Sequence, residues 1–238
     1  MSVNKYDNSK RIKTPSVVQT IPFTRKMVAA YICCGLVTLI SIAFFDRTIA
    51  EYMHVNLQSN LLLQSFSKTP LLLEIIALII VLVSFHRHYK HLFHLRRIII
   101  LVAIIATIVR VSAKMVFGRT WPETWTNDNL SWITHGVEEF HPFSLSNSFH
   151  SFPSGHALLT FAFASLFWHF APRYRLLWCS SMVAVLMGQL GQNYHYLGDL
   201  LAGALIGTLV SHLVINGYSH YNQNTCQNET AEIKKAQY

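Results

Sequence analysis

Charged residues are scarce in this chain. Asp, Glu, Lys and Arg make up 13% of its 238 residues, whereas apolar residues make up 52%. The charged share is about half that of an ordinary soluble domain, and the mean hydropathy is positive at +0.32. This composition argues against a water-soluble globular protein, and it makes lipid the natural solvent for much of the surface.

The few cysteines do not form a disulfide framework. Cys33 and Cys34 are adjacent in the first apolar segment, Cys179 lies in another, and Cys226 lies in a polar tail, so redox chemistry is not indicated. No His, Cys and Asp cluster has the spacing of a closed metal site. We therefore expect no metal and no other cofactor.

A cleavable signal peptide and internal repeats are also not apparent. About 25 polar and basic residues precede the first apolar run, and no small-residue cleavage site follows a short one. We expect the first apolar segment to stay as a membrane anchor.

Long apolar segments are what the chain has instead. Six of them read as membrane spans, some slightly short of the nominal length of about twenty residues: 27–45, 70–85, 98–117, 155–171, 176–192 and 199–215. They predict an all-α fold, an integral membrane bundle of six transmembrane helices over residues 27–216. An outer-face loop spans 118–153, and polar tails cover 1–26 and 217–238.

The basic residues predict the orientation of this bundle. If the chain crosses the membrane six times, fourteen of the 19 Lys and Arg residues fall on one side and five on or near the other. By the positive-inside rule both termini are cytoplasmic and the long loop lies on the outer face. Basic loops facing an anionic leaflet account for the net charge of +8, so no nucleic acid partner is expected.

The same crossings bring polar residues together at the outer end. Lys114 and Arg119 end the third span, His156 opens the fourth, His195 follows the fifth and Asp199 begins the sixth. Two cations, two imidazoles and a carboxylate thus converge at the interface, where a lipid headgroup lies. Imidazoles beside a carboxylate suit transfer of a phosphoryl group to water.

Local spacing supports a phosphate site. Ser154 and Gly155 open a helix whose free N–H groups suit a phosphate. Asp199 is four residues after His195, so it can accept a hydrogen bond from one ring nitrogen and orient the other. Lys114 shares a helix face with Arg110, and cations at this depth are costly enough to indicate a function.

These residues resemble a known family. Lys114 with Pro122, Pro153-Ser-Gly-His156, and His195 with Asp199 are similar to the three signature motifs of the type 2 phosphatidic acid phosphatase superfamily, in its six-span membrane branch. The resemblance covers about residues 90–215. It implies a metal-independent phosphatase in which His195 is the nucleophile that forms a phosphohistidine. It further implies that Asp199 orients His195, that His156 protonates the leaving oxygen, and that Lys114, Ser154 and Gly155 bind the phosphate.

Two arginines of the family pattern are replaced. Trp121 stands where the first motif has arginine, and Gln189 stands where the third motif has one. We expect Arg119 to replace the phosphate-binding arginine missing at Trp121. Arg110 would be a supporting cation paired with Glu74 of the second span.

The predicted function is therefore a membrane lipid phosphatase that hydrolyses a phosphomonoester or diphosphate at the outer face. Its partners would be a lipid phosphate substrate and membrane lipids, with no required protein partner evident. The aromatic-rich segment 122–152 is the expected source of substrate choice, and the identity of the lipid stays open. Two alternatives remain: a phosphotransferase with the same site, and a degenerate protein that only binds or transports lipid phosphate.

Overall fold

The computed structural model describes residues 18–57, 60–125 and 128–236. Most of the predicted N-terminal tail, residues 1–26, therefore lies outside the described residues. Within the described ranges the fold is all-helical, as predicted, and no β-strand is present; two isolated bridges, Arg119 with Phe140 and Trp121 with Ser131, occur in the loop 118–153.

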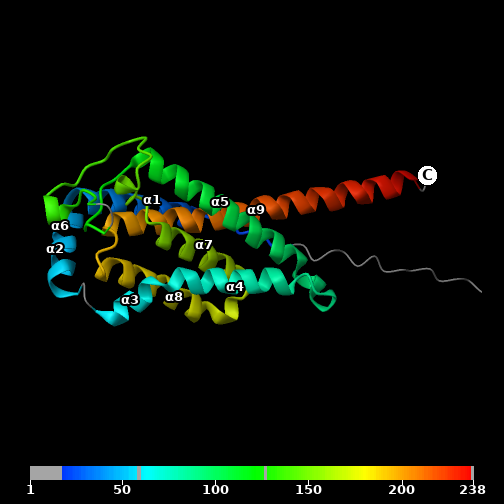
Figure 1. The fold of residues 1–238 in the computed structure, drawn as a ribbon. Coiled ribbons are helices and arrows are strands. Elements are labelled where there is room, and N and C mark those ends of the chain that lie inside the picture. The colour runs from blue at the N-terminus through cyan, green and yellow to red at the C-terminus, as the bar shows by residue number, and fades with distance from the viewer. Residues whose placement is uncertain (1–17, 58–59, 126–127, 237–238) are drawn as a thin grey trace, which may run out of the picture.

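The helices lie side by side in one bundle (Figure 1). The longer ones are α1 (Arg25–Ile40), α2 (Asp46–Asn56), α3 (Leu61–Ser67), α4 (Thr69–Val83), α5 (Phe93–Phe117), α7 (Gly155–Phe170), α8 (Arg175–Gly191) and α9 (Leu197–Ala236). A π-helical segment, η1 (Ser41–Phe45), joins α1 to α2. The short elements are η2 (Arg87–Leu92), α6 (Trp132–His135), η3 (Asn147–Phe149) and η4 (Pro172–Tyr174).

Among the described residues, four helical stretches are long and apolar enough to cross a membrane, so this is a multi-pass membrane protein. They are Arg25–Asn56, Leu61–Val83, Arg87–Phe117 and Leu197–Asn228. The other two predicted spans coincide with α7 and α8, which have 16 and 17 residues. At about 1.5 Å per residue each is roughly 25 Å long, somewhat less than the hydrocarbon core of a typical bilayer.

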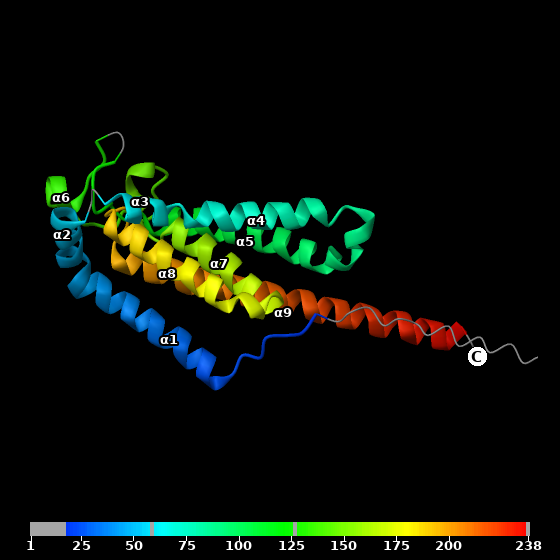
Figure 2. The ribbon, with the colours of Figure 1, turned by 90° about the horizontal axis from the view of Figure 1, so that it is seen from below.

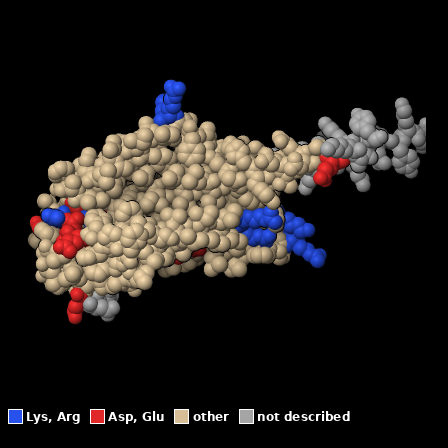
Figure 3. All heavy atoms as spheres, turned by 90° about the horizontal axis from the view of Figure 1, so that it is seen from above, with Lys and Arg blue, Asp and Glu red and all other residues tan. Residues whose placement is uncertain are grey.

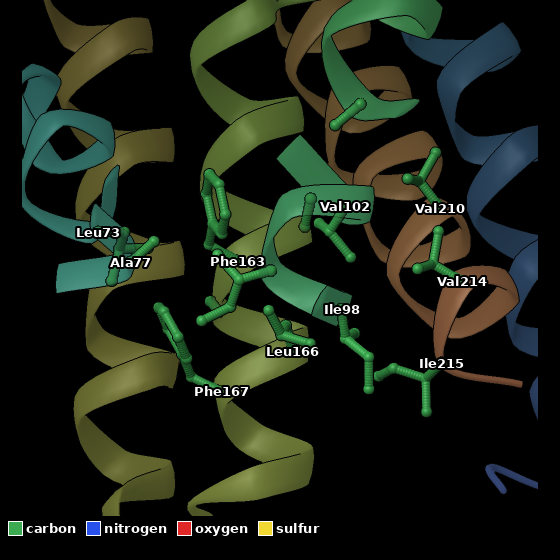
Figure 4. Packing of buried hydrophobic residues seen from close by; sticks show 14 of the residues in the cluster. Leu73, Ala77, Ile98, Val102, Phe163, Leu166, Phe167, Val210, Val214 and Ile215 are labelled. Carbon is green, nitrogen blue, oxygen red and sulfur yellow. The ribbon is translucent and has the colours of Figure 1, made fainter. Parts of the chain in front are cut away.

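Helix α7 forms the centre of the bundle. Its side chains Phe163, Leu166 and Phe167 pack among α4, α5 and α9 (Figure 4). Small residues of α9 allow the two backbones to approach closely: a Cβ atom at Gly203 would lie 2.5 Å from the carbonyl oxygen of Ser154, and one at Gly207 would overlap the carbonyl of Leu158. This contact places the N-terminal ends of α7 and α9 together.

The surface between the two ends of the bundle is mostly uncharged. Figure 3 shows most charged side chains near the ends, one basic group projecting from the upper edge, and a broad face without charges between them. Apolar side chains such as Leu39, Ile79 and Ile108 are more than half exposed there, as expected for a lipid-facing surface.

The two ends differ in what they carry. The first turns of α7 and α9 lie at the end that also holds α2 and α6 (Figures 1 and 2), which we call the site end. At the other end, Ser219 donates a hydrogen bond to the carbonyl of Val18, and the backbone N–H of Ile21 donates to Asn216. The start of the described chain and the later part of α9 therefore lie on the same side of the bundle.

Candidate active site

His195 and Asp199 meet at the site end as their spacing predicted. His195 lies in the turn between α8 and α9, and Asp199 lies in the first turn of α9. Nδ1 of His195 is 3.5 Å from Oδ2 of Asp199, and both side chains are buried. Asn193 helps to form this turn, because it adopts a left-handed conformation with φ of 56° and donates to Glu123.

Asp199 has further partners that the motif spacing did not show. Its Oδ2 accepts hydrogen bonds from Ser151 Oγ at 2.5 Å and from the Tyr196 backbone at 3.2 Å. Its Oδ1 accepts from Arg119 Nη1 at 2.6 Å. Ser151 was not among the predicted site residues; its position just before the Pro-Ser-Gly-His segment was the signal that could have found it.

Arg119 lies behind Asp199 and not in a phosphate site. It is fully buried, pairs with Asp46 at 2.8 Å and with Asp199, and also contacts Glu138. Burial would lower the pKa of Arg119, but these three carboxylates outweigh it and raise the pKa above its ordinary value. The expectation that Arg119 replaces the missing phosphate-binding arginine is therefore corrected, because its charge is paired with three buried carboxylates.

A cavity of about 1040 Å³ opens on the other side of His195. Seven of the predicted site residues line it: Glu74, Arg110, Lys114, Gly155, His156, Gln189 and His195. The other three, Asp199, Arg119 and Ser154, do not, because they lie in the protein behind it. The cavity thus collects cations and both histidines from α5, α7 and the turn before α9.

The two histidines face each other across this cavity. Their ring centroids are 6.4 Å apart at a steep interplanar angle. His156 is exposed in the first turn of α7, whereas His195 is buried. Burial lowers the pKa of His195, and the charge of Lys114 lowers it further, although Asp199 acts in the opposite direction. The lowered pKa favours the neutral ring, in which one nitrogen carries a lone pair.

Lys114 and Arg110 lie beside the N-terminus of α7. A Cβ atom at Gly155 would lie 2.8 Å from Arg110 Cδ and 3.7 Å from Lys114 Cε, so the glycine makes room for both cations. Lys114 Nζ donates to the carbonyl of His150 at 2.6 Å and lies 5.3 Å from the ring centroid of Trp121. The Trp121 ring is in turn 5.1 Å from that of His195. Trp121 therefore forms a wall of the site where the family pattern has a cation.

Two predicted roles differ from the geometry. Ser154 is fully buried as the N-cap of α7, where its hydroxyl accepts from Ala157, so it shapes the helix end instead of reaching the cavity. Glu74 and Arg110 line the same cavity, but the ion pairs of the described residues do not include one between them. Gln189 donates to the carbonyl of Ser67 at 3.1 Å and so ties α8 to α3.

No group of three or more His, Cys, Asp or Glu side chains in the described part of the chain is arranged to hold a metal ion. The cationic side chains of the cavity are Lys68, Arg110 and Lys114. They attract anions, and phosphate is an anion that suits amino and guanidinium groups.

Fold and site together define a multi-pass helical membrane protein with paired histidines and cations around a cavity at one end. The family model of the PAP2 superfamily matches residues 95–222, more than half of the chain. The chain belongs to this superfamily, as the motifs predicted.

Two curated proteins are similar to part of the chain. One is a lipid A 1-phosphatase of Rhizobium johnstonii, 32% identical over 98 residues, which are 41% of this chain and 37% of the relative. The other is a lipid A 1-phosphatase of Rhizobium etli, 32% identical over 94 residues, 40% of this chain and 38% of the relative. The chain thus matches less than two fifths of each relative's length. No solved structure matches it.

Proposed function

We propose that this protein is a membrane lipid phosphatase that works through a phosphohistidine on His195. The observation that carries this proposal is the placement of His195: its Nδ1 lies 3.5 Å from Oδ2 of Asp199, and its ring also borders a cavity lined by His156 and Lys114. Membership in the PAP2 superfamily and the similarity to two lipid A 1-phosphatases support a lipid phosphate as substrate.

The reaction would proceed in two steps. In the first, the lone pair of His195 Nε2 attacks phosphorus, the bond from phosphorus to the lipid oxygen breaks, and protonated His156 gives its proton to that oxygen. In the second, His156 takes a proton from water while the water oxygen attacks phosphorus. The bond to Nε2 then breaks, and inorganic phosphate leaves. Asp199 stabilises the positive charge that develops on the His195 ring.

Lys114, Arg110 and the N-terminus of α7 would stabilise the phosphoryl group. The two side chains border Gly155, the first residue of α7, where free N–H groups and the helix dipole also favour an anion. These fixed charges would stabilise the negative charge of the transition state without a metal ion.

Aromatic side chains favour a headgroup with a flat apolar face. Trp121, Trp125 and Tyr194 all line the cavity, and the rings of Trp125 and Tyr194 are 4.7 Å apart. Among lipid phosphates, a phosphorylated glycolipid fits such a wall, because a sugar ring offers an apolar face between its hydroxyls. The names of the two relatives point to the same class.

For the membrane arrangement we propose six spans, with α7 and α8 crossing inside the protein, both termini cytoplasmic and the site on the outer face. The charge asymmetry of the loops supports this orientation. Cysteine labelling tests it. In a background without the four native cysteines, Leu145→Cys should react with an impermeant thiol reagent on intact cells, and His91→Cys should not. Reaction at position 91 alone would place the site on the cytoplasmic side.

Phosphate release by the purified protein in detergent tests the function. The substrates are phosphatidic acid, phosphatidylglycerol phosphate, a polyprenyl diphosphate and a phosphorylated glycolipid, each with and without EDTA. We expect release from the glycolipid, unchanged by EDTA, and none from the His195→Ala variant. Activity that is lost in EDTA and returns with a divalent ion would contradict the metal-independent mechanism.

The replacement of two family arginines by Trp121 and Gln189 favours one other candidate, a protein that binds lipid phosphate without turnover. It predicts saturable binding of the same lipids and no phosphate release. Transfer of the phosphoryl group to an added acceptor lipid or sugar, without release of inorganic phosphate, would instead indicate a phosphotransferase.

A further inference from the structure

The buried ion-pair cluster behind His195 consists of Arg119, Asp46, Glu138 and Asp199. We propose that Arg119 is a positioning residue of the reaction, which holds Asp199 so that its Oδ2 faces Nδ1 of His195. This inference rests on the proposed function, in which His195 attacks phosphorus.

The two oxygens of Asp199 have separate tasks. Oδ1 accepts from Arg119 Nη1 at 2.6 Å. Oδ2 accepts from Ser151 Oγ and from the Tyr196 N–H, and it is the oxygen 3.5 Å from His195. A carboxylate with an arginine on one oxygen and a hydroxyl and an amide on the other cannot rotate without breaking charge-assisted hydrogen bonds. Asp199 therefore presents one fixed acceptor to the histidine.

Arg119 is itself held from several directions. Its guanidinium lies 4.1 Å from the ring centroid of Tyr196, and Nη2 is 2.8 Å from Asp46 Oδ2. Asp46 is in turn tied to the same turn as the nucleophile, because its Oδ1 accepts from the backbone N–H of Gly198 at 2.9 Å. A Cβ atom at Gly198 would lie 2.8 Å from Asp46 Oδ2, so the glycine permits this contact. Arg119 thus reaches the first turn of α9 through two carboxylates.

The charge of Arg119 is needed at this place. The side chains of Asp46, Glu138 and Asp199 are 4% exposed or less, so water does little to screen their mutual repulsion. A second cation, Arg47, approaches Glu138 from the surface at 2.5 Å and is 57% exposed. Without Arg119 the cluster would take up a proton, and a protonated Asp199 would stabilise the charged His195 ring less well.

A direct role of Arg119 in binding is not supported. The side chain is fully buried and does not line the cavity that His195 and His156 border. Any effect of Arg119 on turnover must therefore pass through Asp199 and its hold on His195.

The experiment compares Arg119→Met and Arg119→Lys with Arg47→Met in the full-length protein. Arg47→Met is the matched control, because it removes a cation from the same cluster at its exposed side. Phosphate release from phosphatidic acid, the phosphorylated glycolipid and an aryl phosphate gives kcat, KM and the pH profile. The 15N shifts of the His195 ring, labelled selectively, report which nitrogen carries the proton.

We expect Arg119→Met to lose roughly 10²–10⁴-fold in kcat, the range for a disturbed general base or its orienting group, with little change in KM. The acid limb of its pH profile should move to higher pH, and His195 should lose its single Nδ1-protonated form. Arg119→Lys should recover part of the loss, and Arg47→Met should resemble the wild type. If Arg119→Met is unfolded in detergent, Arg119→Lys decides by the same readouts.

Two results would overturn the inference. A rise in KM with unchanged kcat would make Arg119 a binding residue. Unchanged kcat and unchanged His195 shifts, with only a lower unfolding temperature, would make its role purely structural. Failure of the proposed function is a different result: the wild type would release no phosphate from any substrate. The nitrogen shifts would then still decide whether Arg119 fixes the His195 ring.

Discussion

The two sides of His195 use their cations differently. Behind the histidine, Arg119 contacts three carboxylates and is fully buried. In front of it, Lys114 donates a hydrogen bond to a backbone carbonyl, and the ion pairs among the described residues give neither Lys114 nor Arg110 a carboxylate. The protein thus neutralises Arg119 with its own carboxylates and leaves Lys114 and Arg110 for the anion of a ligand.

This difference separates a structural charge from a binding charge. A buried cation without an anion costs free energy, more so near lipid. A protein can retain such a cation where a ligand supplies the missing negative charge. Residues that lower local stability are therefore expected at functional sites. Lys114 and Arg110 fit a site for an anion, and Arg119 fits a scaffold.

The largest loss of activity is expected for substitution of His195 and His156. His195→Ala should remove essentially all turnover, because no nucleophile remains. His156→Ala should lose roughly 10²–10⁴-fold on lipid substrates and much less on an activated aryl phosphate, whose leaving oxygen needs no proton. Initial rates on both substrates measure this. Near-normal activity of His195→Ala would end the proposed mechanism.

The next effect contrasts the two classes of cation directly. Lys114→Met should lose about 10²–10³-fold in kcat, as for removal of one positioned charge donor, with normal thermal unfolding. Arg119→Met should also lose about 3–5 kcal/mol in the free energy of unfolding, because it leaves buried carboxylates uncompensated. Arg47→Met is the control, because Arg47 is 57% exposed and does not line the cavity. An unstable Lys114→Met variant would remove the distinction.

A smaller loss is expected for Gly155→Ala. The added Cβ atom would meet Arg110 Cδ at 2.8 Å and displace the guanidinium from the N-terminus of α7. We expect a lower kcat/KM with an unchanged fold. Gly35→Ala is the matched control, because its Cβ atom would meet only Leu205 Cδ2 at 4.0 Å, an ordinary contact. Equal behaviour of the two variants would mean that Arg110 does not act in the site.

The smallest effect is a shift in the pH profile. The charge of Lys114 is one cause of the lowered pKa of His195. Removing that charge raises the pKa of His195, so the ring becomes charged at a higher pH. The acid limb of kcat/KM in Lys114→Met should therefore lie at higher pH than in the wild type. Both proteins are measured on one aryl phosphate, so that the ionisation of the substrate cancels. A limb at the same or a lower pH would contradict the placement of Lys114 beside His195.

Much of the helical architecture could be predicted from local sequence. The apolar runs 155–171 and 176–192 correspond to α7 and α8 within one residue at each end. The predicted first span, 27–45, is shorter than the helical stretch Arg25–Asn56 of the structure. The continuation into α2 contains Asp46, Arg47 and Glu51, which end the apolar run. Such polar residues stay helical here because they bond to other elements, such as Glu51 to Trp132.

The candidate site could be predicted only where its residues are close together in the sequence. His195 and Asp199 are only four residues apart, so the short turn before α9 and the first residues of that helix bring them together. Ser151 and Arg119 reach Asp199 across 48 and 80 residues of sequence, and no local pattern records such a contact. The sequence therefore predicts Arg119 in the phosphate site. The residue does lie close to the site, but its side chain contacts Asp199 and does not line the cavity.

By itself the sequence determined the lipid-compatible composition, the helices and the pairing of His195 with Asp199, because each depends on neighbours within a few turns. Only the tertiary structure decided which cations are neutralised and which remain for a ligand. The physical reason is that an ion pair forms only at close range. Among the described residues, the packing of α2, α9 and the loop 118–153 brings three carboxylates to Arg119 and gives Lys114 no ion pair.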